Sequence, residues 1–213
     1  MKKIFLFLIV FFFTVSTIKA QVKIDKLKPK KIGFLYNYAN EKNFIFDDKD
    51  YSYNTKTYKI QAFYYLGSWK SLDFELIVQP QYQRIYHQLD NEQFVLPSEL
   101  NYLEKRTEFT SPKNINLYGF ELGFVLKKKL LKNIKFLATI GLGVATIDTS
   151  TERLAKGFTF LENGSLGLCY QFYKQSTLYV GSNIGHVSNF DTKKPNNGYS
   201  FLGFEVGLQY ILN

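Results

Sequence analysis

Apolar and polar residues alternate with a period of two over most of this chain. Between 203 and 210, for example, the residues Phe204, Val206, Leu208 and Tyr210 are separated by glycine, glutamate or glutamine. Because side chains i and i+2 of a strand share a face, this alternation predicts strands with one apolar face and one face of polar or small residues. Eight segments follow the pattern, at about 31–38, 57–67, 72–87, 114–127, 133–147, 158–173, 176–189 and 198–213.

The lengths of these segments and of their connections favour a membrane barrel. Several segments have about 12–16 residues, which is longer than the usual strand of a soluble sheet. The connections after the second, fourth and sixth segments are short, whereas those after the first, third, fifth and seventh are long, with 39–56 and 88–113 the longest. Outer-membrane barrels combine short periplasmic turns with long external loops in this way. We therefore predict an all-β protein, an eight-stranded antiparallel transmembrane β-barrel of the outer membrane.

A soluble β-sandwich or a lipocalin-like barrel is the competing interpretation, and it would turn the apolar face inward. The polar face mixes charged residues and glutamines with glycines, which suits either solvent or a narrow lumen. Eight strands close a barrel whose interior side chains just fill, so a general diffusion pore is not expected. In a barrel, four inward-facing residues are expected to form a structural charge network: Lys59, Glu121, Lys135 and Glu205.

The N-terminus has the pattern of a secretory signal peptide. Lys2 and Lys3 precede an apolar run from 4 to 15, and small or polar residues follow up to Ala20. The run has 12 residues, whereas a membrane-spanning helix needs about 20. We expect residues 1–20 to be a signal peptide, 21–30 to be a periplasmic N-terminal segment and 31–213 to form a single β-barrel domain in the cell outer membrane.

The composition narrows the possible chemistry. One cysteine, Cys169, and two histidines, His87 and His186, exclude a disulfide framework and a cysteine-based metal cage. The chain has no Gly-rich phosphate loop. Neither a cofactor nor a metal is therefore expected. Removal of the signal peptide takes away three lysines and no acid, which lowers the net charge from +9 to +6. We expect no nucleic-acid partner.

The seventh segment carries a histidine and a serine on its lipid-facing side. His186 and Ser188 are two residues apart at the end of a strand that runs outward. Residues i and i+2 lie about 6.5–7 Å apart along a strand, so a hydrogen bond between the two side chains is within reach. A base beside a hydroxyl is the minimum for an activated serine nucleophile. A bare pair of this kind most often marks two polar side chains at the headgroup interface, so its surroundings matter.

Those surroundings resemble the lipid A 3-O-deacylase (PagL) family, whose relatives are also called acyloxyacyl hydrolases. The family pattern is H-x-S-N, a short loop, P-N-x-G and a last strand ending in G-x-x-Y. This chain has Gly185-His-Val-Ser-Asn189, then Lys194-Pro-Asn-Asn-Gly198, then Gly207-Leu-Gln-Tyr210. Weaker signals lie at Gly141-Leu-Gly143 and Phe158-Thr-Phe160. The specific resemblance covers about residues 134–213.

The resemblance implies roles for individual residues. Ser188 matches the family's nucleophile and His186 its general base. Asn196 matches an asparagine that helps to hold the oxyanion, and Asn189 matches the residue that shapes the turn after the nucleophile. The implied substrate is lipid A in the outer leaflet, with the ester oxygen stabilised by fixed amide donors as it gains negative charge.

One position departs from the family pattern. The acidic member of the triad falls 14 residues after the histidine, where this chain has Ser200. A serine can orient an imidazole, but it does not stabilise an imidazolium by charge. Asp191 in the adjacent loop and Glu162 on the neighbouring strand are the alternative acids, whereas Glu205 has inward parity. Three states stay open: a weaker enzyme, a triad with a displaced acid, and a non-catalytic relative.

The resemblance therefore predicts an outer-membrane serine esterase that removes an ester-linked acyl chain from lipid A of lipopolysaccharide. The alternative is a structural or adhesive eight-stranded barrel without catalysis, and a soluble periplasmic lipid-binding barrel is the third hypothesis. Lys193 and Lys194 are either ligands of lipid A phosphates or simply solvated loop residues. The acyl position and the oligomeric state stay open.

Overall fold

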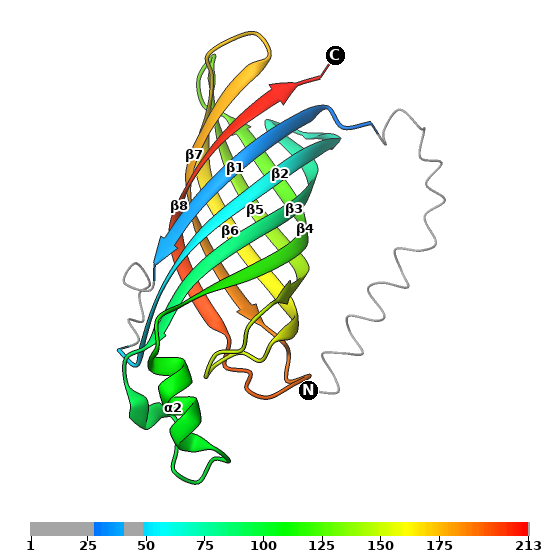
Figure 1. Ribbon diagram of the computed structural model, residues 1–213. Helices are drawn as coiled ribbons and strands as arrows, with labels where there is room; N and C mark the ends of the chain where they lie inside the picture. The colour runs from blue at the N-terminus through cyan, green and yellow to red at the C-terminus, as the bar shows by residue number, and fades with distance from the viewer. Residues whose placement is uncertain (1–27, 41–48, 213) are drawn as a thin grey trace, which may run out of the picture.

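Eight antiparallel strands form one closed sheet in the computed structural model, which describes residues 28–40 and 49–212. The sheet closes where the first strand pairs with the last (Figure 1). The strands are β1 (Lys31–Asn40), β2 (Tyr51–Trp69), β3 (Leu72–Leu89), β4 (Lys113–Lys129), β5 (Ile134–Ile147), β6 (Gly157–Gln171), β7 (Ser176–Ser188) and β8 (Tyr199–Ile211). The predicted eight-stranded barrel is confirmed. The expected signal peptide lies outside the described residues.

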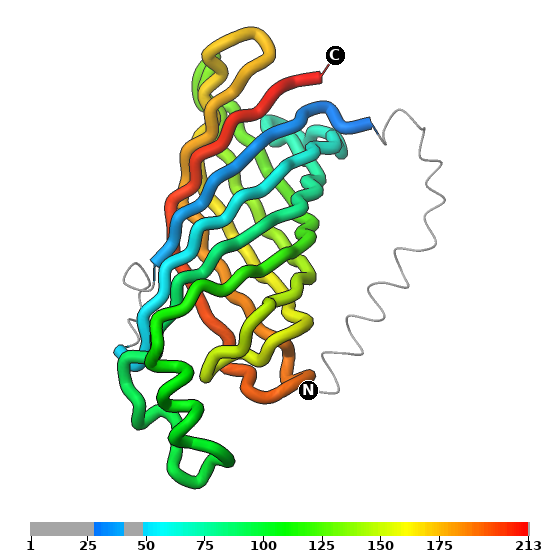
Figure 2. Tube along the Cα trace, viewed as in Figure 1, coloured from blue at the N-terminus to red at the C-terminus, as the bar shows by residue number. Residues whose placement is uncertain are grey.

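The two ends of the barrel differ, as the connection lengths predict. The connections 70–71, 130–133 and 172–175 lie at the same end as residues 28 and 212, and we call this the turn end (Figure 2). The connections after β3, β5 and β7 lie at the opposite end, which we call the loop end (Figure 1).

The largest boundary difference concerns β2, which begins at Tyr51 rather than near 57. Tyr51 and Tyr53 continue the inward alternation, and Tyr51 pairs with Leu89 at the far end of β3. The pattern is weak in the sequence because threonine, at Thr55 and Thr57, takes the inward positions that follow. The β2–β3 ribbon therefore extends further toward the loop end than predicted.

The β3–β4 connection contains two helices that the sequence pattern does not predict. A 3-10 helix, η3, spans Glu92–Phe94, and an α-helix, α2, spans Tyr102–Thr110. Phe109 is the only buried residue of α2, so no apolar stripe marks this helix in the sequence. Among the described residues, no helix is long and apolar enough to cross a membrane.

The outer face of the barrel is apolar. Ile60, Ile140 and Phe204 are between 65% and 71% exposed. Toward the loop end, four outward tyrosines form a row across β1 to β4, with successive ring centroids 5.3, 6.2 and 5.3 Å apart: Tyr36, Tyr58, Tyr82 and Tyr118. An apolar outer band with an aromatic girdle is the surface of a membrane-spanning barrel. The soluble alternative, with its apolar face inside, is therefore wrong.

The lumen is filled in layers. Apolar side chains gather near the loop end, around Ile115, Leu117 and Val187. A second apolar cluster, around Phe63 and Ile77, lies nearer the turn end. Buried polar side chains occupy the level between them. Inward-facing positions therefore include apolar residues as well as the polar and small residues that the alternation predicts.

Glu121 is the centre of the polar layer. Its carboxylate accepts hydrogen bonds from Lys59 Nζ at 3.0 Å, Gln79 Nε2 at 2.8 Å and Asn163 Nδ2 at 2.6 Å. Gly141 faces it from β5, and a Cβ at that position would overlap the carboxylate. The ion pair of Glu121 with Lys59 confirms part of the predicted charge network.

The other two members of that predicted network lie in different surroundings. Glu205 is buried in the lumen and accepts a hydrogen bond from Tyr179 Oη at 3.0 Å. Lys135 does not join the network. It lines a cavity of about 340 Å³ at the turn end, together with Lys132, because its strand position lies near that end.

Glu121→Leu is expected to lower the stability of the barrel strongly. The change leaves the Lys59 ammonium buried without its carboxylate, and breaking a buried ion pair from one side costs about 3–5 kcal/mol. The double variant Lys59→Met/Glu121→Leu should lose less, because no charge is left unpaired. The measurement is the temperature at which the folded gel band of the purified barrel converts to the unfolded band. A single variant as stable as the parent would contradict this account of the lumen.

Candidate active site

The end of β7 presents the predicted pair on the outer face of the barrel. His186 and Ser188 are half-buried and alternate with Gly185 and Val187, which are buried in the lumen. Neither side chain points into the barrel. The orientation is the one that the alternation predicts, and it leaves both side chains on the side from which a membrane lipid would approach.

His186 is bound on one edge by the residue at the family's acid position. The sheet register places Glu162 of β6, His186 of β7 and Ser200 of β8 in one row. His186 Nδ1 and Ser200 Oγ are 2.8 Å apart, within hydrogen-bond distance. A serine at this position therefore still contacts the imidazole and fixes the orientation of its ring.

The other ring nitrogen, Nε2, lies beside Gly198. A Cβ at Gly198 would come within 3.0 Å of His186 Nε2 and would overlap the Val187 carbonyl oxygen. Gly198 also has φ +65°, a conformation that favours glycine. The β7–β8 register ends with Val187 opposite Tyr199, one residue before Ser188 and one after Gly198. The imidazole thus turns its Nε2 edge toward Gly198, at the end of the β7–β8 pairing where Ser188 lies.

Ser188 Oγ makes no side-chain hydrogen bond within the described ranges, 28–40 and 49–212. Its hydroxyl is therefore not held by a structural partner. In proteins with an activated serine, the bond between nucleophile and base is often loose without substrate and tightens when substrate binds. The arrangement is compatible with proton transfer from Ser188 to His186 Nε2.

Asn189 holds the loop that follows Ser188. It is buried, and its Nδ2 donates to the backbone oxygens of Lys193 at 2.7 Å and Pro195 at 3.4 Å. Its backbone N–H donates to Asn196 Oδ1 at 2.6 Å. These contacts fit the turn-shaping role that the resemblance implies for Asn189.

Asn196 is positioned by the same contacts. Because its Oδ1 accepts from Asn189, its amide nitrogen is turned away from that backbone, and part of its donor capacity is used on the Asp191 carboxylate. A carboxamide nitrogen carries two N–H groups, so a further donor remains for an oxyanion.

The two alternative acids differ in their surroundings. Asp191 is exposed and lies 2.6 Å from Lys194 Nζ, and the hydrogen bond from Lys194 lowers the pKa of the Asp191 carboxyl. Glu162 is exposed on the outer face of β6, directly across the strand pair from His186. In the part of the chain that the structure describes, neither carboxylate hydrogen-bonds His186. Glu162 is the acid that faces it.

The β5–β6 connection contacts the loop that precedes β8, and the sequence pattern does not predict this contact. Arg153, in the β5–β6 connection, donates from Nε to the Gly198 oxygen at 3.1 Å and accepts from Asn197 N–H at 2.7 Å through its own carbonyl. Leu154 forms a β-bridge with Asn196. No motif or periodicity marks Arg153, because its role depends on contacts with residues about 45 positions away.

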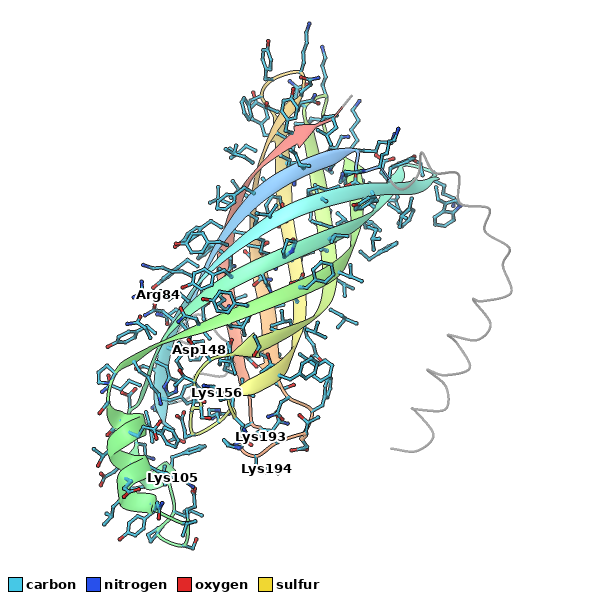
Figure 3. The ribbon with its side chains drawn as sticks, turned by 45° about the vertical axis from the view of Figure 1, so that its right-hand side comes forward. Arg84, Lys105, Asp148, Lys156, Lys193 and Lys194 are labelled. Carbon is cyan, nitrogen blue, oxygen red and sulfur yellow. The ribbon has the colours of Figure 1, made fainter. Side chains whose placement is uncertain are left out.

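In the described part of the chain, the other histidine, the cysteine and the two loop lysines make no hydrogen bond or ion pair with His186 or Ser188. His87 is buried and pairs with Glu152 at 3.1 Å. Cys169 is buried in the lumen. Lys193 and Lys194 are exposed at the loop end, where Figure 3 labels them. Within the described residues, no group of three or more His, Cys, Asp or Glu side chains could hold a metal ion.

Comparison with known proteins gives one family. A family model described as lipid A 3-O-deacylase (PagL) matches residues 51–209, from the start of β2 into β8, including both halves of the motif. No curated protein matches the sequence.

Several solved barrels are similar in outline. The outer membrane enzyme PagL is 14% identical, with a TM-score of 0.46 over 85% of this chain and 99% of that chain. Neisserial surface protein A (NspA) is 13% identical, with a TM-score of 0.47 over 85% of this chain and 96% of that chain. A de novo designed transmembrane β-barrel is 11% identical, with a TM-score of 0.39 over 87% of this chain and 98% of that chain.

Proposed function

The chain belongs to the lipid A 3-O-deacylase (PagL) family, and we propose that it is an outer-membrane serine esterase that removes an ester-linked acyl chain from lipid A of lipopolysaccharide. One observation carries the proposal. His186, on the outer face of β7, is bound at Nδ1 by Ser200 and has its Nε2 edge beside Gly198, at the end of the β7–β8 pairing next to Ser188. This arrangement supports the proposal of a general base near a serine nucleophile.

The proposed reaction begins with attack of Ser188 Oγ on the ester carbonyl carbon, while His186 Nε2 takes the hydroxyl proton. The oxyanion that forms accepts a hydrogen bond from the Asn196 amide, in the way that fixed donors stabilise acyl-transfer intermediates. The carbon–oxygen bond to the sugar then breaks, and the imidazolium returns its proton to the leaving alkoxide. Water, activated by His186, hydrolyses the acyl-enzyme and releases the fatty acid.

Location supports the same proposal. We propose that residues 1–20 are removed on export, that the barrel lies in the outer membrane, and that the loop end faces outward, since long loops are external in such barrels. Ser188 is the last residue of β7 at that end. The nucleophile would then meet the polar part of a lipid in the outer leaflet, where lipid A lies, and no soluble cleft is needed.

In this mechanism Ser200 is a positioning residue. A serine hydroxyl fixes the imidazole by a hydrogen bond, but it supplies no negative charge behind the imidazolium. Glu162, exposed across the strand pair, is the nearest source of such charge in the row. In the proposed enzyme, the uncharged hydroxyl of Ser200 therefore orients the imidazole, and the Glu162 carboxylate lies beside it.

Ser200→Ala is expected to lower the deacylation rate about 10-fold, the cost of one hydrogen bond to the base. Ser200→Glu should raise the rate above that of the parent, because it restores charge behind the imidazole. Asp191→Asn is the control and should have little effect on the deacylation rate, because the Asp191 carboxylate is paired with Lys194. The measurement is kcat for fatty-acid release. A large loss with Glu162→Gln, together with no loss with Ser200→Ala, would assign the orienting role to Glu162 instead.

The second candidate function is a structural or adhesive barrel without catalysis, and the serine at the acid position favours it. The deciding experiment uses the purified, folded barrel with lipid A in detergent and a chelator present. The esterase proposal predicts stoichiometric release of hydroxy fatty acid over several turnovers. A folded protein that releases no acyl chain from several types of lipid A would establish the non-catalytic function.

A further inference from the structure

A cavity at the loop end adjoins the proposed oxyanion residue. It has a volume of about 500 Å³, within the range of roughly 300–1,000 Å³ that is usual for small-molecule sites. Its wall includes Phe94, Lys105 and Phe109 from the β3–β4 connection, and Lys194 and Asn196 from the β7–β8 connection. Asn196 is thus shared between this cavity and the proposed active site.

The walls of the cavity are held together by hydrogen bonds between loops. Arg106 donates from Nε and Nη2 to the Val95 oxygen, at 3.0 and 2.9 Å, which ties α2 to the segment after η3. The Ala155 N–H donates to the Pro195 oxygen at 3.0 Å, which joins the β5–β6 and β7–β8 connections. The cavity is therefore preformed, so little ordering is needed when a ligand enters.

The aromatic rings and lysines of the lining suit a phosphorylated sugar, and its two glutamates are both paired, Glu99 with Lys105 and Glu152 with His87. Phe94 and Phe109 provide apolar faces on which a sugar ring can pack. Lys105 and Lys194 both line the cavity, and Figure 3 labels the first on α2 and the second on the β7–β8 loop. Each ammonium is now paired only at the surface, Lys105 with Glu99 at 3.0 Å and Lys194 with Asp191 at 2.6 Å. An exposed ion pair contributes about 0–1 kcal/mol to stability. Replacing the carboxylate partner of each lysine by a phosphate group therefore costs little free energy.

The position of the cavity relative to Ser188 indicates which molecule supplies that sugar. The acyl chains of a membrane lipid lie along the outer face of the barrel, and its headgroup projects past the loop end. An ester held at Ser188 and Asn196 would extend its headgroup toward the other side of Asn196, where the cavity lies. We propose that this cavity binds the phosphorylated saccharide headgroup of the same lipid A molecule whose ester Ser188 attacks. The inference rests on the proposed function.

The test uses the variant Lys105→Glu/Lys194→Glu and two substrates. One is phosphorylated lipid A, and the other is a p-nitrophenyl acyl ester, which has an acyl chain and no sugar. Loss of a hydrogen bond to a charged group costs about tenfold in affinity or more, so KM for lipid A should rise about 100-fold with kcat little changed. KM for the p-nitrophenyl ester should stay within twofold of the parent. Lys132→Glu/Lys174→Glu, an equal charge change in the turn-end connections 130–133 and 172–175, is the control.

A binding measurement separates failure of this inference from failure of the proposed function. The ligand is chemically O-deacylated lipid A, which keeps its phosphates and has no ester to cleave, titrated into detergent-solubilised protein. The parent should bind it and the double lysine variant should bind about 100-fold more weakly. Binding without any deacylation would retain the saccharide site and overturn only the esterase. An unchanged KM for lipid A, an equal rise in KM for both substrates, or equal binding by parent and variant would overturn the site.

Discussion

Ser188→Ala is expected to abolish deacylation of lipid A, with a fall in kcat of about 10⁴-fold or more, as in other serine hydrolases that lose the nucleophile. The side chain faces outward at the end of β7, and no other hydroxyl residue occupies the nucleophile position of the motif. His186→Asn should cause a nearly equal loss, because a serine hydroxyl is a poor nucleophile without its base. The measurement is hydroxy fatty acid released per mole of folded protein.

The matched control for this prediction is Ser182→Ala. Ser182 lies on the same strand and the same outer face, six residues from Ser188, and it is exposed. The control should keep full activity and the heat-dependent gel shift of a closed barrel. Equal activity of Ser188→Ala and the parent protein would remove Ser188 from the mechanism.

Gly198→Ala is expected to lower activity about 100-fold or more while the barrel still folds. A Cβ at this position would overlap the Val187 carbonyl oxygen and press on His186 Nε2, and an alanine is strained at φ +65°. Because Ser200 holds the Nδ1 edge of the His186 ring, the ring cannot move away from the new Cβ without losing that hydrogen bond. A displacement of about 1 Å in a catalytic group can cost about 10²-fold in rate.

Gly164→Ala is the comparison for Gly198→Ala. Gly164 lies on neighbouring β6, and a Cβ there would meet only Ile184, at an ordinary contact distance of 3.5 Å. This substitution should leave both the fold and the activity intact. Full activity of Gly198→Ala would show that the imidazole has room to move and that its close approach to Gly198 has no catalytic importance.

The barrel and the outward orientation of the site follow from period-two alternation, which is a local signal. Because parity alone decides which face a side chain occupies, the outward positions of His186, Ser188 and Ser200 could be predicted from their spacing. The row that joins Glu162, His186 and Ser200 could also be expected, since neighbouring antiparallel strands pair in sequence order.

Other parts of the site depend on contacts that no local pattern carries. Helix α2 buries only Phe109, so its sequence has no helical periodicity. Arg153 braces the Gly198 oxygen from another connection, and such a contact exists only after the barrel has closed. The motif glycine Gly198 is recognisable in the sequence, but the reason for it, the nearby imidazole, becomes visible only in three dimensions.

Mass spectrometry of lipid A from cells tests the central claim most directly. Lipid A would be extracted from cells that carry the parent protein, the Ser188→Ala variant or no copy, with equal amounts of both proteins in the outer membrane. The proposed function predicts that lipid A loses the mass of one ester-linked acyl chain only in cells with the parent protein. Identical lipid A spectra from all three cell lines, with the folded barrel present, would contradict it.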